Sequence, residues 1–237
     1  MVGPGHPSRP ERSETADRYL ETIYYIEHEG EVPRPGRLAE WLGVSAPTVS
    51  VSLQRLVRDG WITVAPDRSV SLTPAGNDAA AGIVRRHRIL ERWLTDVLGL
   101  DWGRADQEAE SMAHGLSELV LERLDGHLGR PDTCPHGNRI PGRGGPERRL
   151  VSLGAVELDL PAVVSRISEV AEHDAPLLLG SLHRDGVVPG ARVIVRGRDQ
   201  EWVRLRVGED REVSLAPATA AAVWVEDPCP PFPGVVL

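Results

Sequence analysis

The sequence contains no lysine, only two cysteines and no long hydrophobic run. All 27 cationic side chains other than histidine are arginine, so each phosphate contact can be rigid and bidentate. Cys134 and Cys229 lie far apart in proline-containing segments, and a chain of 237 residues can build a core without a disulfide. No apolar run approaches the roughly 18 residues that cross a membrane, and the N-terminal segment MVGPGHPSRPERSET lacks the apolar core of a secretory signal. We therefore expect a cytoplasmic protein without membrane contact.

The overall charge is acidic, with a formal net charge of -8. This charge argues against a nonspecific nucleic-acid coat. It does not exclude a specific DNA reader, because phosphate contacts depend on where the cations lie. With 41% hydrophobic and 26% charged residues, the composition is typical of a globular protein, and the length has room for up to three small domains.

The strongest local pattern is the segment RPGRLAEWLGVSAPTVSVSLQRLVRDGWITV, which begins at Arg34. It predicts two short helices around a turn at Gly43, and such a helix-turn-helix lays its second helix in the DNA major groove. The alternating runs Trp61–Val64 and Val70–Thr73 then predict a two-stranded wing. We expect a disordered tail over residues 1–12 and a winged helix-turn-helix DNA-binding domain over 13–80.

Polar residues occur where a groove-facing helix needs them. Serine and threonine cluster at the start of the second helix, and arginines follow on that helix and in the wing, where they can reach phosphates. The candidates from this pattern are Ser45, Thr48, Ser50, Arg55, Arg58 and Arg68. The alternative interpretation is a small helical packing unit with no DNA role.

Two consecutive helices are predicted between Gly82 and His114, with a break at Gly99. On each helix, carboxylate and imidazole side chains recur at steps of four, so they share one helix face. Such ligands suit a divalent first-row metal such as Mn, Fe or Zn. The candidate ligands are His87, Glu91, Asp106, Glu110 and His114. The alternative is a solvated, salt-bridged surface that uses the neighbouring arginines.

The remaining segments predict a helical part followed by a β-rich part. The pattern over 116–128 suits a buried or dimerising helix face, so 81–145 is expected to be a metal-binding and dimerisation domain. Its loop contains Cys134 and His136, which we do not assign as metal ligands because no second pair follows at matching spacing. We expect a linker over 146–159, a small antiparallel barrel of short alternating strands over 160–226, and a disordered tail over 227–237.

This order of parts resembles the diphtheria toxin repressor family of iron- and manganese-dependent transcriptional regulators. The motifs that carry the resemblance are YLETIY (19–24), SAPTVSVSLQRLVRDG (45–60), APDRSVSLTPAG (65–76), RRHRILERWLTDVLG (85–99) and CPHGNRIPG (134–142). The resemblance implies a mainly α fold with small β parts: a winged helix-turn-helix, a helical dimerisation domain and a C-terminal SH3-like β-barrel. It also implies a homodimer that represses metal-homeostasis genes from a palindromic operator, with no enzyme activity and no small-molecule substrate.

The resemblance also implies two metal sites. The family's ancillary site falls on His87, Glu91 and Asp106, with further ligands expected near Glu172–Asp174. Glu21 matches a ligand on the first helix in the manganese branch, and the primary site keeps Glu110 and His114. Without a thiolate ligand, these residues favour Mn(II) or Fe(II), with Zn(II) as a competitor.

Three positions depart from the family pattern. Ala113 replaces a glutamate of the primary site, and Arg18 replaces the methionine or aspartate of the first helix. Arginine cannot bind a cation. Val51 replaces a base-reading glutamine, while Ser45 and Pro47 retain base-contacting positions. We therefore expect an operator that is read partly through thymine methyl groups.

These departures leave alternatives to metal control open. The guanidinium of Arg18 could pair with Glu110 and act as a metal surrogate, whereas in the other interpretation Arg18 faces solvent and Asp17 contributes instead. A winged-helix regulator of the same fold that has lost or rewired its metal dependence is one alternative function. A metal enzyme is another, but it would need an open coordination position and a substrate cleft.

Overall fold

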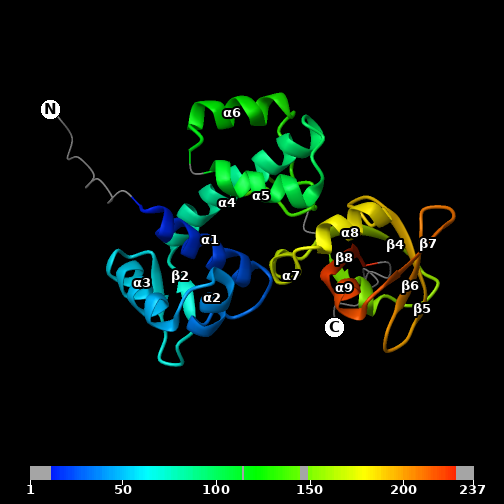
Figure 1. The fold of residues 1–237 in the computed structure, drawn as a ribbon, viewed down its shortest axis with the longest axis horizontal. Coiled ribbons are helices and arrows are strands. Elements are labelled where there is room, and N and C mark those ends of the chain that lie inside the picture. The colour runs from blue at the N-terminus through cyan, green and yellow to red at the C-terminus, as the bar shows by residue number, and fades with distance from the viewer. Residues whose placement is uncertain (1–11, 114, 145–148, 228–237) are drawn as a thin grey trace, which may run out of the picture. The chain divides into compact units, whose positions relative to one another are not determined.

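The computed structural model describes residues 12–113, 115–144 and 149–227 of the chain. It divides into two compact units, Met1–Ile83 and Val84–Leu237, and each is described by itself. Figure 1 shows helices in both units and a β-sheet in the second. Among the described residues, no helix is long and apolar enough to cross a membrane.

The first unit contains three helices and a β-hairpin. Helix α1 spans Glu14–His28, α2 spans Pro35–Leu42 and α3 spans Ala46–Arg58 (Figure 1). Ser13 and Ser45 cap α1 and α3, since each side chain accepts a hydrogen bond from a backbone N–H in the first turn. Gly43 ends α2 in the left-handed conformation (φ 63°), which creates the tight turn into α3. The expected helix-turn-helix is thus present.

The hairpin forms the expected wing. Strands β1 (Ile62–Val64) and β2 (Val70–Leu72) pair antiparallel, with Ile62 opposite Leu72. Asp67 fixes the connecting turn, because its carboxylate accepts hydrogen bonds from the backbone N–H and the hydroxyl of Ser69. Arg68 adopts a positive φ of 66° at this turn. The apolar faces of α1, α2, α3 and the hairpin form the core of this unit, which includes Leu20, Ile23, Leu38, Val49, Leu56, Ile62 and Val70.

Helix α4 (Pro74–Asp96) leads from the first unit into the second, where it is followed by α5 (Trp102–Ala113) and α6 (Glu118–His127). Gly99 has a φ of 71°, and Asp101 accepts a hydrogen bond from the backbone N–H of Arg104 at the start of α5. These features produce the predicted break between the helices. Alanines at every fourth position of α5 pack against Leu90 and Leu94 of α4.

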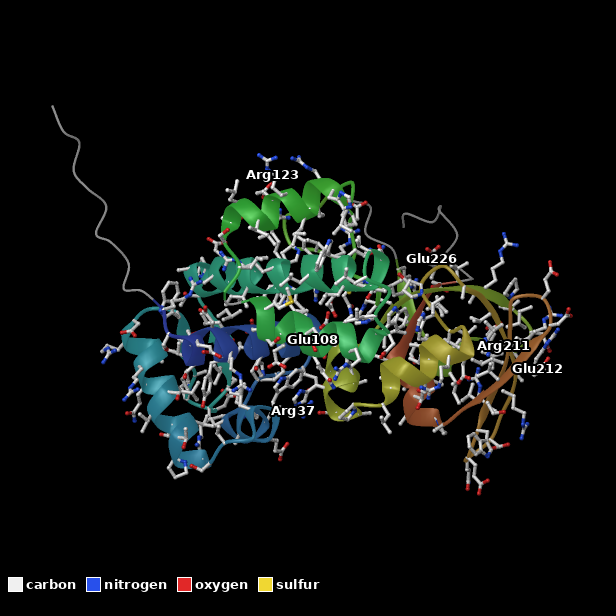
Figure 2. The ribbon with its side chains drawn as sticks, turned by 45° about the horizontal axis from the view of Figure 1, so that its top comes forward. Arg37, Glu108, Arg123, Arg211, Glu212 and Glu226 are labelled. Carbon is white, nitrogen blue, oxygen red and sulfur yellow. The ribbon has the colours of Figure 1, made fainter. Side chains whose placement is uncertain are left out.

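The rest of the second unit is a six-stranded antiparallel sheet in the order β3-β8-β4-β5-β6-β7. The strands are β3 (Leu150–Ser152), β4 (Pro161–Ile167), β5 (Arg192–Arg198), β6 (Val203–Val207), β7 (Arg211–Leu215) and β8 (Val223–Glu226). Irregular register in β4 and β5 bends the sheet around an apolar core. Arg211 and Glu212 on β7 are exposed (Figure 2).

The structure differs from the predicted domain pattern at several elements. Residues expected in the linker form β3, which pairs with β8, and the 3-10 turn Leu153–Ala155. The run ISEVAE (167–172) lies in the segment expected to form short alternating strands. It instead ends β4 and starts helix α7 (Glu169–Asp174), because Ser168 caps that helix by accepting a hydrogen bond from the N–H of Ala171. Two further helices, α8 (Leu178–Asp185) and α9 (Pro217–Ala222), connect strands (Figure 1).

The helical part 84–144 and the sheet belong to one compact unit. Trp102 of α5 lies in the apolar core of the sheet and stacks on His183 of α8, with 4.8 Å between the ring centroids. The predicted fold class is confirmed: a mainly α chain with a winged helix-turn-helix and a small C-terminal β domain. The tails expected at 1–12 and 227–237 fall almost entirely outside the described residues.

Candidate functional site

A buried carboxylate, Glu91 on α4, lies at the centre of a cluster of metal-ligand side chains. His87 sits one turn earlier on the same helix face, with its Nε2 3.6 Å from Glu91 Oε1. The same Nε2 lies 3.2 Å from Asp106 Oδ1 on α5. Glu91 is only 3% exposed, so it does not belong to a solvated, salt-bridged surface as the alternative interpretation required. Three of the predicted ligands are therefore together.

The CPHGN loop brings two further potential ligand atoms, which were not assigned from the sequence, close to Glu91. Cys134 and His136 are each 1% exposed, and together with Glu91 they form a second group whose ligand atoms all lie within 4.8 Å of one another. His136 Nδ1 is 3.3 Å from Glu91 Oε1. This pair was not assigned as metal ligands from the sequence, whereas the fold brings both side chains beside Glu91. The sequence shows the spacing Cys-x-His, but it does not show that the pair lies near Glu91, which is 43 residues before Cys134.

Hydrogen bonds to strand β4 hold this loop in place. The carbonyl of His136 accepts from the N–H of Ile167, and the Asn138 side-chain amide donates to the carbonyl of Ile167. Gly137 has a φ of 86°, and a Cβ there would lie 2.0 Å from the carbonyl oxygen of Ser165. Only glycine fits this close backbone approach without a shift. The loop is thus fixed between α4 and the sheet.

Helix α7 contributes a third part of the cluster. Glu172 Oε2 lies 3.7 Å from His136 Nδ1, in the range 172–174 where the family resemblance places further ligands. Close by, the buried Arg88 of α4 donates to Glu169 Oε1 at 2.6 Å. This ion pair ties α4 to α7 beside the cluster.

The ionisation of the cluster reflects burial and close charges. Burial alone would lower the pKa of His87, but the Glu91 carboxylate and the hydrogen bond to Asp106 raise it well above its ordinary value. Burial would raise the pKa of Glu91, but His136, His87 and Arg88 hold it below the ordinary value. Glu91 is therefore an anion that two imidazole rings face.

Two other groups hold their protons more tightly. Burial, followed by the carboxylates of Asp106 and Glu169, raises the pKa of Glu172 well above its usual range. Burial also raises the pKa of the Cys134 thiol, and the charge of Glu91 adds to the effect. Their surroundings therefore favour the protonated, neutral forms of the Glu172 carboxyl and the Cys134 thiol when no cation is bound.

The cluster passes a simple test of fit for a divalent metal. His136 Nε2 and Glu172 Oε2 are buried, and neither has a hydrogen-bond partner among the described residues. Buried polar atoms without partners are costly unless a water or an ion satisfies them. The imidazole, carboxylate and thiol donors match those of transition-metal sites. The residues that could hold the ion are His87, Glu91, Asp106, Cys134, His136 and Glu172.

The structure does not place the ligands predicted for the primary site in this cluster. Glu110 follows Asp106 by one turn of α5 but is exposed, and the ligand groups formed by the described residues do not include it. His114 lies outside the described residues. Ala113 is 5% exposed and packs among the apolar side chains of α4 and α5, so no ligand stands at that position.

The first helix carries the other two metal-related predictions. Glu21 on α1 is half-buried and accepts a hydrogen bond from the Tyr25 hydroxyl at 3.0 Å. Arg18 is exposed on the same helix, and its neighbour Asp17 accepts from Arg12 at 2.7 Å. These residues belong to the first compact unit and Glu110 to the second.

All eight predicted DNA contacts are exposed residues of the first unit. Helix α3 and its cap present seven of them, and the wing presents Arg68. Their side chains are exposed, while Val49, Leu53 and Leu56 of the same helix are buried. The eight residues are Ser45, Pro47, Thr48, Ser50, Val51, Arg55, Arg58 and Arg68.

Helix α6 presents an apolar face. Leu119 is 68% exposed and Val120 is 44% exposed, whereas Leu121 is buried. Arg123 points away from the rest of the unit (Figure 2). Asp125, with 1% exposed, anchors the helix by ion pairs with Arg85 and Arg143. The exposed leucine and valine fit the dimerising face predicted for 116–128.

Comparison with known families agrees with this architecture. Residues 11–70 match the N-terminal DNA-binding domain of the iron-dependent repressors, and residues 73–142 match their metal-binding and dimerisation domain. The chain is 40% identical to the iron-dependent repressor IdeR of Mycobacterium tuberculosis over 224 residues, which cover 90% of this chain and 97% of IdeR. It is 44% identical to the diphtheria toxin repressor of Corynebacterium diphtheriae over 158 residues, which cover 67% of each chain.

Solved structures show the same fold. A manganese-dependent transcriptional repressor in complex with manganese superposes with a TM-score of 0.77 at 32% identity, covering 90% of this chain and 99% of that one. The IdeR structure from T. acidophilum superposes with a TM-score of 0.73 at 27% identity, covering 92% and 100%. The family predicted from the sequence motifs is confirmed, and it is one of repressors, not enzymes. The chain therefore belongs to the family of iron-dependent transcriptional repressors.

Proposed function

We propose that this chain is a metal-dependent transcriptional repressor that acts in the cytoplasm as a homodimer on a palindromic operator. The observation that carries the proposal is the buried cluster around Glu91, together with the exposed recognition helix in the same chain. The kinship to iron- and manganese-dependent repressors supports it. Fe(II) or Mn(II) fits the carboxylate and imidazole donors, and Zn(II) is a competitor because a thiol is also present.

The proposed metal ligands come from four segments of the second unit. His87 and Glu91 are on α4, Asp106 is on α5, and the CPHGN loop and α7 supply the rest. A divalent cation bound there would supply the positive charge that these acidic and neutral donors lack. The residues themselves set the relative placement of α4, α5 and the β domain. If the DNA-binding form is the one in which they are ordered, metal and DNA strengthen each other's binding by the same factor.

This ancillary-type cluster is proposed as the controlling site because the primary site is incomplete. The side chain of Ala113 is a methyl group that packs in an apolar cluster, so it offers no ligand atom. Arg18 cannot coordinate a cation either, because its guanidinium has no acceptor atom. Dimerisation is proposed to use α6, where Leu119 and Val120 are exposed and Asp125 holds the helix in place. Arginines of α3 and the wing are proposed to contact phosphates, and Ser45, Pro47 and Val51 to face base edges.

Metal surrogacy by Arg18 stays a prediction from the sequence. Arg18 is exposed on α1, so its replacement is compatible with folding of that helix. If the guanidinium substitutes for a cation, Arg18→Asp will make operator binding more dependent on Mn(II), as measured by fluorescence anisotropy. Unchanged metal dependence in that variant argues against the surrogate, and Arg92→Asp on the partly exposed side of α4 serves as the charge-matched control.

The proposed function is tested by selecting DNA duplexes from a random pool with the purified full chain. Selections are run at fixed salt with Mn(II), with Fe(II) under anaerobic conditions, and with a chelator, because phosphate contacts make affinity depend strongly on salt. We expect a palindromic duplex to be enriched with metal and not with chelator. Equal enrichment in chelator overturns the metal dependence, and no enrichment under any condition overturns the proposal.

A further inference from the structure

The exposed side of helix α3 is defined by its buried side. Val49, Leu53 and Leu56 are 0%, 6% and 3% exposed and face the core of the first unit. Exposed residues on the opposite side are spaced i, i+4, i+7 and i+11, so they stack along a single line of the helix. These residues are Pro47, Val51, Gln54 and Arg58.

Gln54 is the neutral polar member of this line with a free side chain. The hydroxyls of Ser45 and Thr48 are hydrogen-bonded to each other at 2.8 Å, and the guanidinium of Arg58 donates to Asp59 at 2.8 Å. The amide of Gln54 makes no hydrogen bond within the described part of the chain. It therefore keeps both its acceptor oxygen and its donor nitrogen for a ligand.

From this placement we propose that Gln54 reads adenine in the major groove of the operator; the inference rests on the proposed DNA-binding function. A glutamine amide pairs with adenine in a bidentate way: its oxygen accepts from the N6 amino group and its nitrogen donates to N7. Gln54 would therefore supply the glutamine side chain for base reading that is missing at Val51. In this chain, the glutamine that reads a base lies about one turn further along α3 than Val51.

The position of Val51 indicates which base pair lies next to this adenine. Three residues along an α-helix advance about 4.5 Å, which is close to the roughly 3.4 Å spacing of neighbouring base pairs on one strand. Val51 is 48% exposed and offers two methyl groups, which suit the thymine C5-methyl group. Each half-site is therefore expected to contain a thymine next to the adenine that Gln54 reads.

The test is a comparison of selected duplexes for the full chain and two variants, in the presence of Mn(II). The wild-type chain is expected to require adenine at one position of each half-site. Gln54→Ala is expected to lose about 5- to 150-fold discrimination at that position and at no other. Gln54→Glu is expected to prefer cytosine there, because a carboxylate accepts a hydrogen bond from the cytosine N4 amino group.

Two controls separate this inference from the proposed function. Arg55→Ala, which removes a candidate phosphate contact, is expected to weaken binding to all duplexes alike and to reduce the salt slope by about 1. Gln107→Ala, an exposed glutamine on α5, is expected to leave the base profile unchanged. A wild-type base profile in both Gln54 variants overturns the reading of adenine and leaves DNA binding by the chain intact. A wild-type chain that enriches no sequence overturns both.

Discussion

At the residue scale, a single carboxylate organises the candidate metal centre. Glu91 faces His87 on its own helix and His136 from the CPHGN loop, at 3.6 Å and 3.3 Å. Its pKa is lowered by these neighbours although burial opposes the shift. The carboxylate is therefore charged where the apolar interior would otherwise favour the neutral form, which is an arrangement suited to a cation.

Cys134 gives a spectroscopic test of the centre. The chain has one other cysteine, Cys229, which lies outside the described residues. If Cys134 is a ligand, the Co(II)-loaded protein will show a thiolate-to-metal charge-transfer absorption that Cys134→Ser removes and Cys229→Ser retains. An absorption that persists in Cys134→Ser, or that is lost in Cys229→Ser, contradicts the assignment.

The sequence indicated four of the six candidate ligands of this cluster, all except Cys134 and His136. The four-residue spacing placed His87 with Glu91 on one helix and Asp106 on the next, and the family resemblance added the expectation of further ligands near Glu172–Asp174. The contribution of Cys134 and His136 could not be predicted, because their proximity to α4 depends on tertiary contacts of the loop with β4. Glu110 shares a helix face with Asp106, and the resemblance assigned it to the separate primary site; it lies one turn beyond Asp106 and is exposed.

At the element scale, helix α6 depends on a buried ion pair. Asp125 lies opposite Arg85 of α4 at 2.8 Å and also pairs with Arg143. Burial would raise the pKa of Asp125, but the hydrogen bonds from Arg143 and Arg85 lower it below its ordinary value. Because the shift is downward, its contribution to stability is present above the unfolded-state pKa and is lost as pH falls through the folded-state pKa.

We therefore expect Asp125→Asn to lower the free energy of unfolding by about 1–3 kcal/mol at neutral pH, since the two arginines lose their charged partner. The difference from wild type should shrink as the pH falls below the ordinary aspartate value of 3.8. The matched control is Glu122→Gln, because Glu122 pairs with the same guanidinium at 3.1 Å but is exposed, and exposed pairs contribute about 0–1 kcal/mol. Equal effects of both variants in urea unfolding would argue against a buried anchor.

Elements with strong local signals were predicted well, and those fixed by tertiary contacts were not. The α2–α3 turn follows from Gly43 and the cap Ser45, and the wing follows from alternating residues around Asp67. Strand β3 was missed because its three residues gain a strand conformation only by pairing with β8. Helix α7 was missed because the alternation in ISEVAE resembles a strand, whereas the Ser168 cap starts a helix.

At the scale of the whole molecule, the centre couples metal binding to protonation. The pKa values of His87, Glu172 and the Cys134 thiol are all raised, so these ligands carry more protons in the folded metal-free chain than in the unfolded one. Groups with raised pKa values favour the folded state at low pH, and this contribution is lost as pH rises through the folded-state values. A bound cation must displace the same protons.

The expected consequence is that Mn(II) stabilises the protein more as pH rises. The thermal unfolding midpoint is measured with and without saturating Mn(II) from about pH 6 to pH 8. This range begins below the ordinary histidine pKa of 6.5 and extends above it. The increase in midpoint caused by Mn(II) should grow with pH. An increase that is constant or declines with pH would show that these ligands are not deprotonated on binding.

The central claim is that a metal bound around Glu91 controls operator affinity, and one measurement tests it most directly. The affinity of the selected duplex is measured by fluorescence anisotropy at fixed salt, as a function of free Mn(II), for wild type, Glu91→Gln and the control Glu108→Gln on α5 (Figure 2). We expect Mn(II) to raise affinity about 5- to 150-fold for wild type and Glu108→Gln, and to have little effect on Glu91→Gln. A full response to Mn(II) in Glu91→Gln would contradict the account.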